Sequence, residues 1–192
     1  MTSKSDPQDD PKLQDRRIRK TRNAIRAALK TLLQRGSIEQ ITIKDIAREA
    51  DIGYTTFFRH FGTKEAAIAD FADTAAAELL DATLPLLSTS DGLTSTLALC
   101  HHVAANRHVW EALLTGGAAD YVRSSLAAHT TERATLWPPM QDWLPADKGT
   151  ILATGMVVET LTWWLAHAPE LSPEQVAQIM NHTFISALLG AR

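Results

Sequence analysis

Apolar residues recur three and four positions apart along most of this chain, and no segment alternates convincingly between apolar and polar residues. Spacings of three and four place side chains on one face of an α-helix, whereas a half-buried strand alternates with period two. The pattern therefore predicts an all-α fold of about nine helices. The longest expected helices span residues 15–35, 64–84, 146–168 and 173–189. The last has a strong start signal, with Ser172 as the N-cap, Pro173 in the first turn and Gln175 three residues after the cap.

The stretch 42–61, TIKDIAREADIGYTTFFRHF, predicts two short helices joined by a sharp turn. Thr42 precedes the first helix as its expected N-cap, with Asp45 three residues further along. One apolar face of this helix carries Ile43, Ile46, Ala47 and Ala50. Gly53 is expected to supply the backbone freedom that the turn needs.

The second helix of this pair has two different faces. Phe57 and Phe61 lie four residues apart and are expected to face inward. The side chains left on the outer face are Tyr54, Thr55, Thr56, Arg59 and His60. A helix-turn-helix needs this division, because the second helix is braced from behind while its front enters the DNA major groove.

These residues resemble the DNA-binding segment of TetR-family regulators. The matching runs are TIKDIA at 42–47, ADIG at 50–53 and TFFRHFGTKEA at 56–66. The resemblance extends over about residues 16–71, and many of its positions match in register. It implies an N-terminal three-helix helix-turn-helix DNA-binding domain and a C-terminal helical ligand-binding and dimerisation domain.

Three positions depart from the usual pattern of that family. Gly53 stands where a serine cap is usual, and Thr55 stands where glycine is common. Phe58 replaces the usual tyrosine and lacks the hydroxyl for a phosphate contact.

The expected domain boundaries follow from the motif and the composition. Residues 1–14 are polar and contain two prolines, so we expect a disordered arm. Residues 15–62 would form the DNA-binding domain, and residues 63–192 the regulatory and dimerisation domain.

Charge is divided unevenly along the chain, whose formal net charge is −3. Residues 1–65 hold 14 basic and 9 acidic side chains, a net charge of +5. Residues 66–192 hold 5 basic and 13 acidic side chains, a net charge of −8. This division indicates that only the N-terminal part meets phosphates.

The resemblance and the side-chain chemistry together give a set of candidate contacts with double-stranded operator DNA. Base edges would be read by Tyr54, Thr55, Thr56 and Arg59. Phosphates would be held by Thr42, Lys44, His60 and Lys64, and by Arg22 from the first helix. His60 has a second interpretation, in which it only caps or packs near Phe61.

The last two helices are unusually apolar. The first carries Ile151, Met156, Leu161, Trp163 and Trp164, and the second carries Val176, Ile179, Met180 and Phe184. By the resemblance, they would pair with their copies in a homodimer, with Trp164 at the interface. The alternative is ordinary core packing within one chain.

The C-terminal part mixes aromatic and softly polar side chains, as small-molecule sites do. The candidate ligand-binding residues are His101, Trp110, Tyr121, Trp137, Met156, Glu159 and Trp163. The resemblance implies a small-molecule inducer, whose identity the sequence does not reveal. The alternative is that these residues belong to the core or the interface, with Glu159 pairing across the dimer.

The sequence argues against a membrane protein, a disulfide-bonded secreted protein and a metalloenzyme. The apolar stretch 150–168 contains Glu159 and His167, which argues against a membrane span. The single cysteine, Cys100, rules out an internal disulfide, and with no visible secretory signal it fits a cytoplasmic protein. Cys100 and the adjacent histidines lack the spacing of a metal site. We therefore expect no enzyme activity, no metal and no cofactor.

The sequence as a whole predicts a ligand-responsive transcriptional repressor. It would bind a palindromic operator as a homodimer and be released by an inducer. The alternative is a helix-turn-helix regulator that has no inducer and is controlled by a protein partner.

Overall fold

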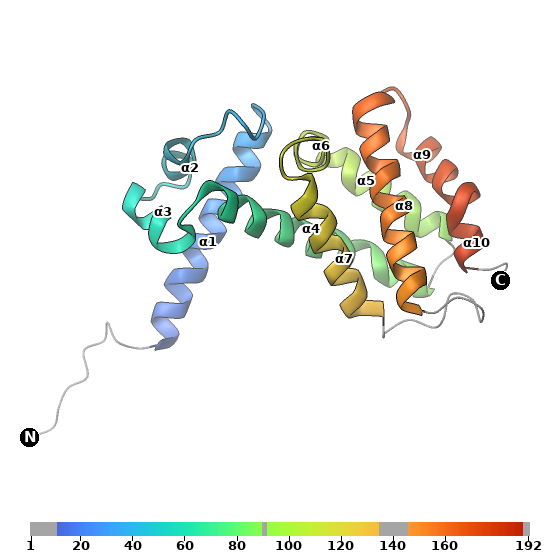
Figure 1. Cartoon of the computed structure of the whole chain (residues 1–192), viewed down its shortest axis with the longest axis horizontal. Helices are drawn as coiled ribbons and strands as arrows, with labels where there is room; N and C mark the ends of the chain where they lie inside the picture. The colour runs from blue at the N-terminus through green and yellow to red at the C-terminus, as the bar shows by residue number, and fades with distance from the viewer. Residues whose placement is uncertain (1–10, 90–91, 135–145, 190–192) are drawn as a thin grey trace, which may run out of the picture. The chain divides into compact units, whose positions relative to one another are not determined.

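The computed structural model describes residues 11–89, 92–134 and 146–189, which are helical apart from turns and short connections (Figure 1). The chain divides into two compact units, one ending at Phe71 and the other starting at Ala72. We call them the head and the body. The division falls at 71/72, within a helix, whereas the sequence suggested 62/63.

The head is built from α1 (Pro11–Leu33), α2 (Ile43–Glu49), α3 (Tyr54–Phe61) and the first turns of α4 (Lys64–Thr89). Helix α1 begins at Pro11, so residues 11–14, expected in a disordered arm, are helical. Residues 1–10 lie outside the described residues.

The head has a continuous apolar core drawn from all four helices. Its fully or almost fully buried side chains include Ile25, Leu29, Leu33, Ile46, Ala47, Phe57, Ala67 and Ile68. Ile18, which fits the same helical stripe of α1, is instead 40% exposed. It lies nearly two turns before Ile25, so the packed part of the stripe begins later than the periodicity suggests.

Helix α4 continues past the point where the sequence predicts its end. We expected it to stop at residue 84, before Pro85, but it extends to Thr89. A proline removes one backbone donor and crowds the preceding turn, which weakens a helix without necessarily ending it.

The body contains the remaining helices. They are α5 (Gly92–Ala105), α6 (Arg107–Thr115), α7 (Ala119–Ala134), α8 (Ala146–His167), α9 (Pro173–Met180), the π-helical segment η2 (Asn181–Ile185) and α10 (Ser186–Leu189). The last three form one continuous helix, so the described part of the chain holds nine helices in all. Helices α6 and α7 pack against α8, and α5 packs against α9.

The start of α9 is encoded locally. The Ser172 hydroxyl accepts a hydrogen bond from the backbone N–H of Gln175, and the Gln175 side chain accepts one from the N–H of Ser172. Pro173 occupies the first turn, where its missing donor costs nothing. The predicted helix start is confirmed.

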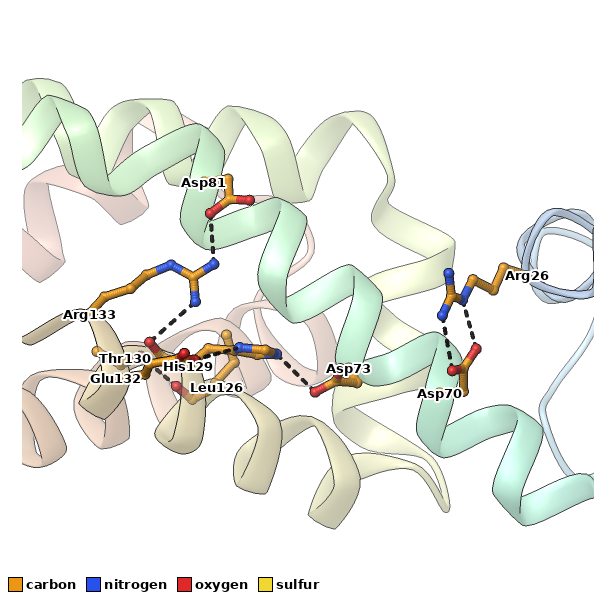
Figure 2. A network of polar contacts seen from close by, with 9 residues as sticks. All are labelled: Arg26, Asp70, Asp73, Asp81, Leu126, His129, Thr130, Glu132 and Arg133. Carbon is orange, nitrogen blue, oxygen red and sulfur yellow. Dashed lines mark hydrogen bonds and ion pairs between the residues drawn. The ribbon is translucent and has the colours of Figure 1, made fainter. Parts of the chain in front are cut away.

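Within the body, two polar contacts join α4 to α7. Asp73 lies 2.8 Å from Nε2 of His129, and Asp81 lies 2.8 Å from the guanidinium of Arg133 (Figure 2). These acids are eight residues apart on α4 and the bases four apart on α7. The two contacts therefore link α4 and α7 at two points along their length.

Helix α8 has one buried and one exposed face, although its sequence is apolar nearly all round. Val158, Leu161 and Trp164 are buried, and the Trp164 indole N–H donates to the carbonyl of Leu171 at 3.0 Å. Trp164 is only 1% exposed, so the expectation that it forms a subunit interface was wrong. Its neighbour Trp163 is 43% exposed, because adjacent helical residues point about 100° apart.

No helix in the described ranges is both long and apolar enough to cross a membrane.

Candidate DNA-binding surface

The first helix of the pair, α2, begins with a reciprocal cap. The Thr42 hydroxyl accepts a hydrogen bond from the Asp45 backbone N–H, while the Asp45 carboxylate accepts one from the Thr42 N–H at 3.1 Å. The same hydroxyl donates to Asp45 at 2.6 Å. These hydrogen bonds from Thr42, followed by the charge of Arg48, hold the pKa of Asp45 below its ordinary value. The predicted cap is confirmed.

The turn between α2 and α3 is made differently from our expectation. Asp51 has the left-handed φ of 53°, while Gly53 has an ordinary extended conformation with φ −66° and ψ 146°. Aspartate tolerates the left-handed region better than most residues. Gly53 is instead the N-cap of α3, and its carbonyl accepts from the N–H of Thr56 at 2.9 Å. The prediction that Gly53 supplies the backbone freedom of the turn was wrong, because the left-handed residue is Asp51.

Helix α3 packs against the head core on one side and exposes its other side to solvent. Phe57 is fully buried in the head core. Tyr54 is 48% exposed and Phe58 41% exposed, and Thr55 and Arg59 are also exposed. The structure therefore places four outer side chains on one surface, which we call the α3 face, defined by Tyr54, Thr55, Phe58 and Arg59.

Thr56 and His60 lie at the border of this face and are half-buried. Burial lowers the pKa of His60 below its ordinary value of 6.5, and the nearby charges of Arg59 and Arg22 lower it further. The imidazole is therefore mostly neutral at pH 7. It retains an N–H donor for a phosphate oxygen and carries less positive charge than an unperturbed histidine would.

Lys44 is exposed on α2. Lys64 is used differently, because its ammonium donates to the carbonyls of Ile38 at 3.1 Å and Ile41 at 3.0 Å. These bonds tie the start of α4 to the connector before α2. The structure thus gives Lys64 a structural role that its position in the motif did not reveal.

Arg22, Arg26 and Asp70 form a cluster between α1 and α4, which we call the α1–α4 clamp. Arg22 pairs with Asp70 and lies 5.1 Å from the Phe61 ring centre. Arg26 holds Asp70 through two bonds of 2.7 and 2.9 Å (Figure 2). Arg22 keeps 42% of its side chain exposed, so only part of it remains open to a phosphate.

The clamp sets the protonation of Asp70, whose side chain is 11% exposed. Burial alone would raise the pKa of Asp70, but the hydrogen bonds and charges of Arg26 and Arg22 outweigh burial and hold it below 3.8. The sequence motif does not point to Asp70. Its only signal in the sequence is an acid within the apolar run of α4.

The candidate ligand-binding residues do not converge on one site. Trp110 is 2% exposed and belongs to the core, whereas His101 and Tyr121 are exposed on α5 and α7. Nε2 of His101 lies 3.2 Å from Glu174. Trp137 lies outside the described residues.

The other three candidates line a solvent-open groove of about 690 Å³ over α8, α9 and η2. Its lining residues are Ile151, Leu152, Gly155, Met156, Glu159, Thr160, Trp163, Ile179, Thr183 and Phe184. Glu159, at 64% side-chain exposure, pairs with Arg123 of α7. We call this feature the α8–α9 groove.

Comparison with known proteins agrees with the geometry of the head. Residues 24–70 match the family model described as bacterial regulatory proteins of the tetR family. The chain has a TetR-family DNA-binding domain. The match covers α2, α3 and the clamp residues Arg26 and Asp70.

Several solved structures share the fold over most of the chain. A TetR regulator from Streptococcus agalactiae is 22% identical, with a TM-score of 0.60, and the alignment covers 89% of this chain and 97% of that one. FadR, a fatty acid degradation regulator from Bacillus halodurans, is 14% identical, with a TM-score of 0.64 and 98% coverage of both chains. RolR in complex with resorcinol is 19% identical, with a TM-score of 0.61 and coverage of 92% and 91%.

These identities establish the TetR-type fold and leave the ligand and the operator open. Comparison with curated protein sequences found no match. The proteins of this family are transcription factors and not enzymes.

Gly53→Ser is expected to stabilise the head by about 0.5–1 kcal/mol, because serine caps a helix better than glycine and restricts the unfolded chain. An added Cβ would meet its nearest atom, the Thr56 hydroxyl oxygen, at an ordinary 3.6 Å. The measurement is urea unfolding followed by far-ultraviolet circular dichroism.

Gly62→Ser is the matched control for that variant. Gly62 has φ +70°, where a side chain is strained, so this second change should destabilise the head. All five tryptophans lie in the body, so their fluorescence should report the same body transition in both variants. Equal effects of the two serines would contradict the assignment of Gly53 as a cap.

Asp70→Asn should destabilise the head by about 2 kcal/mol at pH 7, because it leaves two clamped arginines without their counter-charge. The folded-state pKa of Asp70 is depressed, so its contribution is complete above about pH 4 and is lost as pH falls through the folded pKa. The difference between wild type and variant should therefore shrink below pH 4.

Hydrogen exchange of head amides across this pH range would measure that difference. Asp73→Asn is the control, because Asp73 lies one turn further along α4 with 56% of its side chain exposed. A difference for Asp70→Asn that stays constant down to pH 2 would show that the clamp carries no charge-dependent stability.

Proposed function

We propose that this chain is a ligand-responsive transcriptional repressor that binds a palindromic operator as a homodimer. The observation that carries the proposal is the α3 face. Tyr54, Thr55, Phe58 and Arg59 point away from a head whose core is closed behind Phe57. A short helix braced in this way suits the DNA major groove.

The chemistry of the α3 face suits base readout. The Arg59 guanidinium offers the forked donors that pair with guanine, and the Thr55 hydroxyl both donates and accepts. Lys44 and the open part of Arg22 supply positive charge for phosphates, together with the basic start of α1. Thr42 and Lys64 contribute indirectly, by capping α2 and by holding the connector before it.

A protein that binds chromosomal DNA works in the cytoplasm of a bacterium, and we propose that location here.

The homodimer would use the α8–α9 groove. Its exposed apolar side chains are Ile151 at 47%, Leu152 at 50%, Trp163 at 43% and Ile179 at 37%. Exposed apolar groups of this size gathered in one groove favour a protein interface. A second copy is the occupant that also explains the head, because a twofold pair presents two α3 helices to a palindrome.

Gly155 supports the same assignment. It lies in the middle of α8 and lines the groove, and an added Cβ there would meet nothing within 4 Å. A glycine inside a helix costs about 1 kcal/mol relative to alanine, so this position needs a reason. Close approach of a partner helix over Gly155 provides one.

The proposed inducer is a small molecule bound by the body. RolR, which shares the fold, was solved with resorcinol, so a small aromatic compound is a reasonable first probe. One observation favours the alternative of control by a protein partner: the described candidate residues do not enclose a common cavity. Thermal shift against a compound library separates the two, because a ligand that binds the folded state raises its melting temperature.

Arg59→Ala is expected to weaken operator binding by about 10- to 100-fold, the value of one bidentate base contact. Thr56→Ala should act in the same direction with a smaller effect, because Thr56 is half-buried. The operator would be selected from random duplex DNA, and affinities measured by fluorescence anisotropy.

Arg133→Ala removes the same charge from the body and serves as the control for Arg59→Ala. Its affinity should stay within about twofold of wild type, since its partner is Asp81 of α4. Unchanged binding by both Arg59→Ala and Thr56→Ala would place the reading surface elsewhere.

Trp163→Glu should dissociate the dimer, because twofold symmetry places two carboxylates in the apolar interface at once. Loss of a large aromatic anchor typically costs 2 kcal/mol or more, so we expect the dimer dissociation constant to rise at least about 30-fold. Sedimentation velocity at micromolar concentration measures it. Tyr121→Glu, at a residue with similar exposure (40%) on α7, should leave the dimer intact.

A further inference from the structure

Two exposed aromatic rings lie side by side on α3. Tyr54 and Phe58 are one helical turn apart, and their ring centres are 4.9 Å apart at an angle of 69°. They keep 48% and 41% of their surface open to solvent. The motif explains that α3 needs an outer face, but it does not explain an apolar ring on that face.

The Phe58 ring is held in place from two sides. Besides Tyr54, it has an edge contact with Phe57 at 5.8 Å between ring centres, and Phe57 is fully buried. Edge-to-face contacts at these distances fix the orientation of a ring. Phe58 is therefore an apolar surface set in a defined position before any partner arrives.

The chemistry of phenylalanine restricts what it can recognise. Phe58 has no group that donates or accepts a hydrogen bond, so it cannot read the polar edge of a base. Among base edges in the major groove, the apolar group is the C5 methyl of thymine. A phenyl ring buries such a methyl well, and a phosphate gains little from it.

We propose that Phe58, braced by Tyr54 and Phe57, packs against a thymine methyl in each half-site of the operator. This inference rests on the proposed function and adds a specificity determinant to it. It requires a T·A pair at one fixed position of each half-site. Arg59, the next residue along the helix, would read a neighbouring pair by hydrogen bonding.

A protein partner is the competing occupant for these rings. The surroundings favour DNA, because the same face carries exposed Thr55 and Arg59 and the first 65 residues have a net charge of +5. The cores of protein interfaces are depleted of charge, whereas an apolar ring among hydroxyls and guanidinium groups matches the mixed surface of a major groove.

The experiment uses the full chain and an operator selected from random duplex DNA. Each thymine of the selected site is replaced in turn by deoxyuridine, which removes only the methyl group. Burying one methyl group at the interface strengthens binding by about fourfold. We expect a loss of about fourfold at one thymine per half-site and about fifteenfold when both half-sites are changed.

Variants assign that loss to a residue. Phe58→Ala should bind thymine and deoxyuridine operators equally, whereas Phe58→Tyr, which keeps the ring, should still discriminate. Tyr121→Ala, which truncates a similarly exposed ring in the body, should behave as wild type. Measurements at low salt keep weak variants on the DNA through their phosphate contacts. Circular dichroism checks that Phe58→Ala remains folded, as expected for an exposed side chain.

The outcomes separate this inference from the function on which it rests. If selection enriches no sequence, the proposed operator binding fails and this inference fails with it. If a specific operator emerges but no thymine methyl matters to the wild type, only the role of Phe58 is overturned. A methyl effect that persists in Phe58→Ala also overturns the role of Phe58. A protein partner would then be the remaining candidate to bind the exposed rings.

Discussion

The burial of Phe57 is the contact on which the DNA-binding surface depends. Helix α3 has only eight residues, too few to be stable alone in water. With Phe57 at zero exposure in the core formed with α1, α2 and α4, the helix is fixed in both position and rotation. Everything on the α3 face, from the Tyr54–Phe58 ring pair to Arg59, takes its direction from that anchor.

Helix α4 carries acids that pair with different helices along its length. In the head, Asp70 meets Arg22 and Arg26 of α1. In the body, Asp73 meets His129 and Asp81 meets Arg133, both on α7 (Figure 2). The side chain of Asp70 is only 11% exposed, whereas those of Asp73 and Asp81 are 56% and 67% exposed. Removing Asp70 would leave two arginines without their counter-charge at a partly buried site, which costs more than breaking an exposed pair.

The α8–α9 groove bears on both halves of the regulatory proposal. Met156, Glu159 and Trp163 were candidate ligand contacts, and they lie among exposed apolar side chains suited to a second copy. A homodimer through this groove would cover them. Under that proposal, an inducer site would have to form elsewhere in the body, or in the partnered groove itself.

The sequence by itself determined the elements and the head motif. Helical spacing located nearly every helix, and the caps at Thr42 and Ser172 marked two starts correctly, because capping is a bond between residues three positions apart. Phe57 was assigned inward on the same local reasoning. These features depend on residues close together in the chain, so they can be predicted from the sequence.

Only the tertiary structure decided which of several chemically similar side chains are buried, and which partners the polar side chains bind. The fold exposes Trp163 and buries its neighbour Trp164. It pairs Asp70 with arginines more than 40 positions earlier, and it directs the Lys64 ammonium to backbone carbonyls. It also placed the left-handed angle at Asp51 rather than Gly53. Each outcome was set by packing between segments distant in sequence or by the closure of a turn between two packed helices, so hydrophobicity and residue type alone left several solutions open.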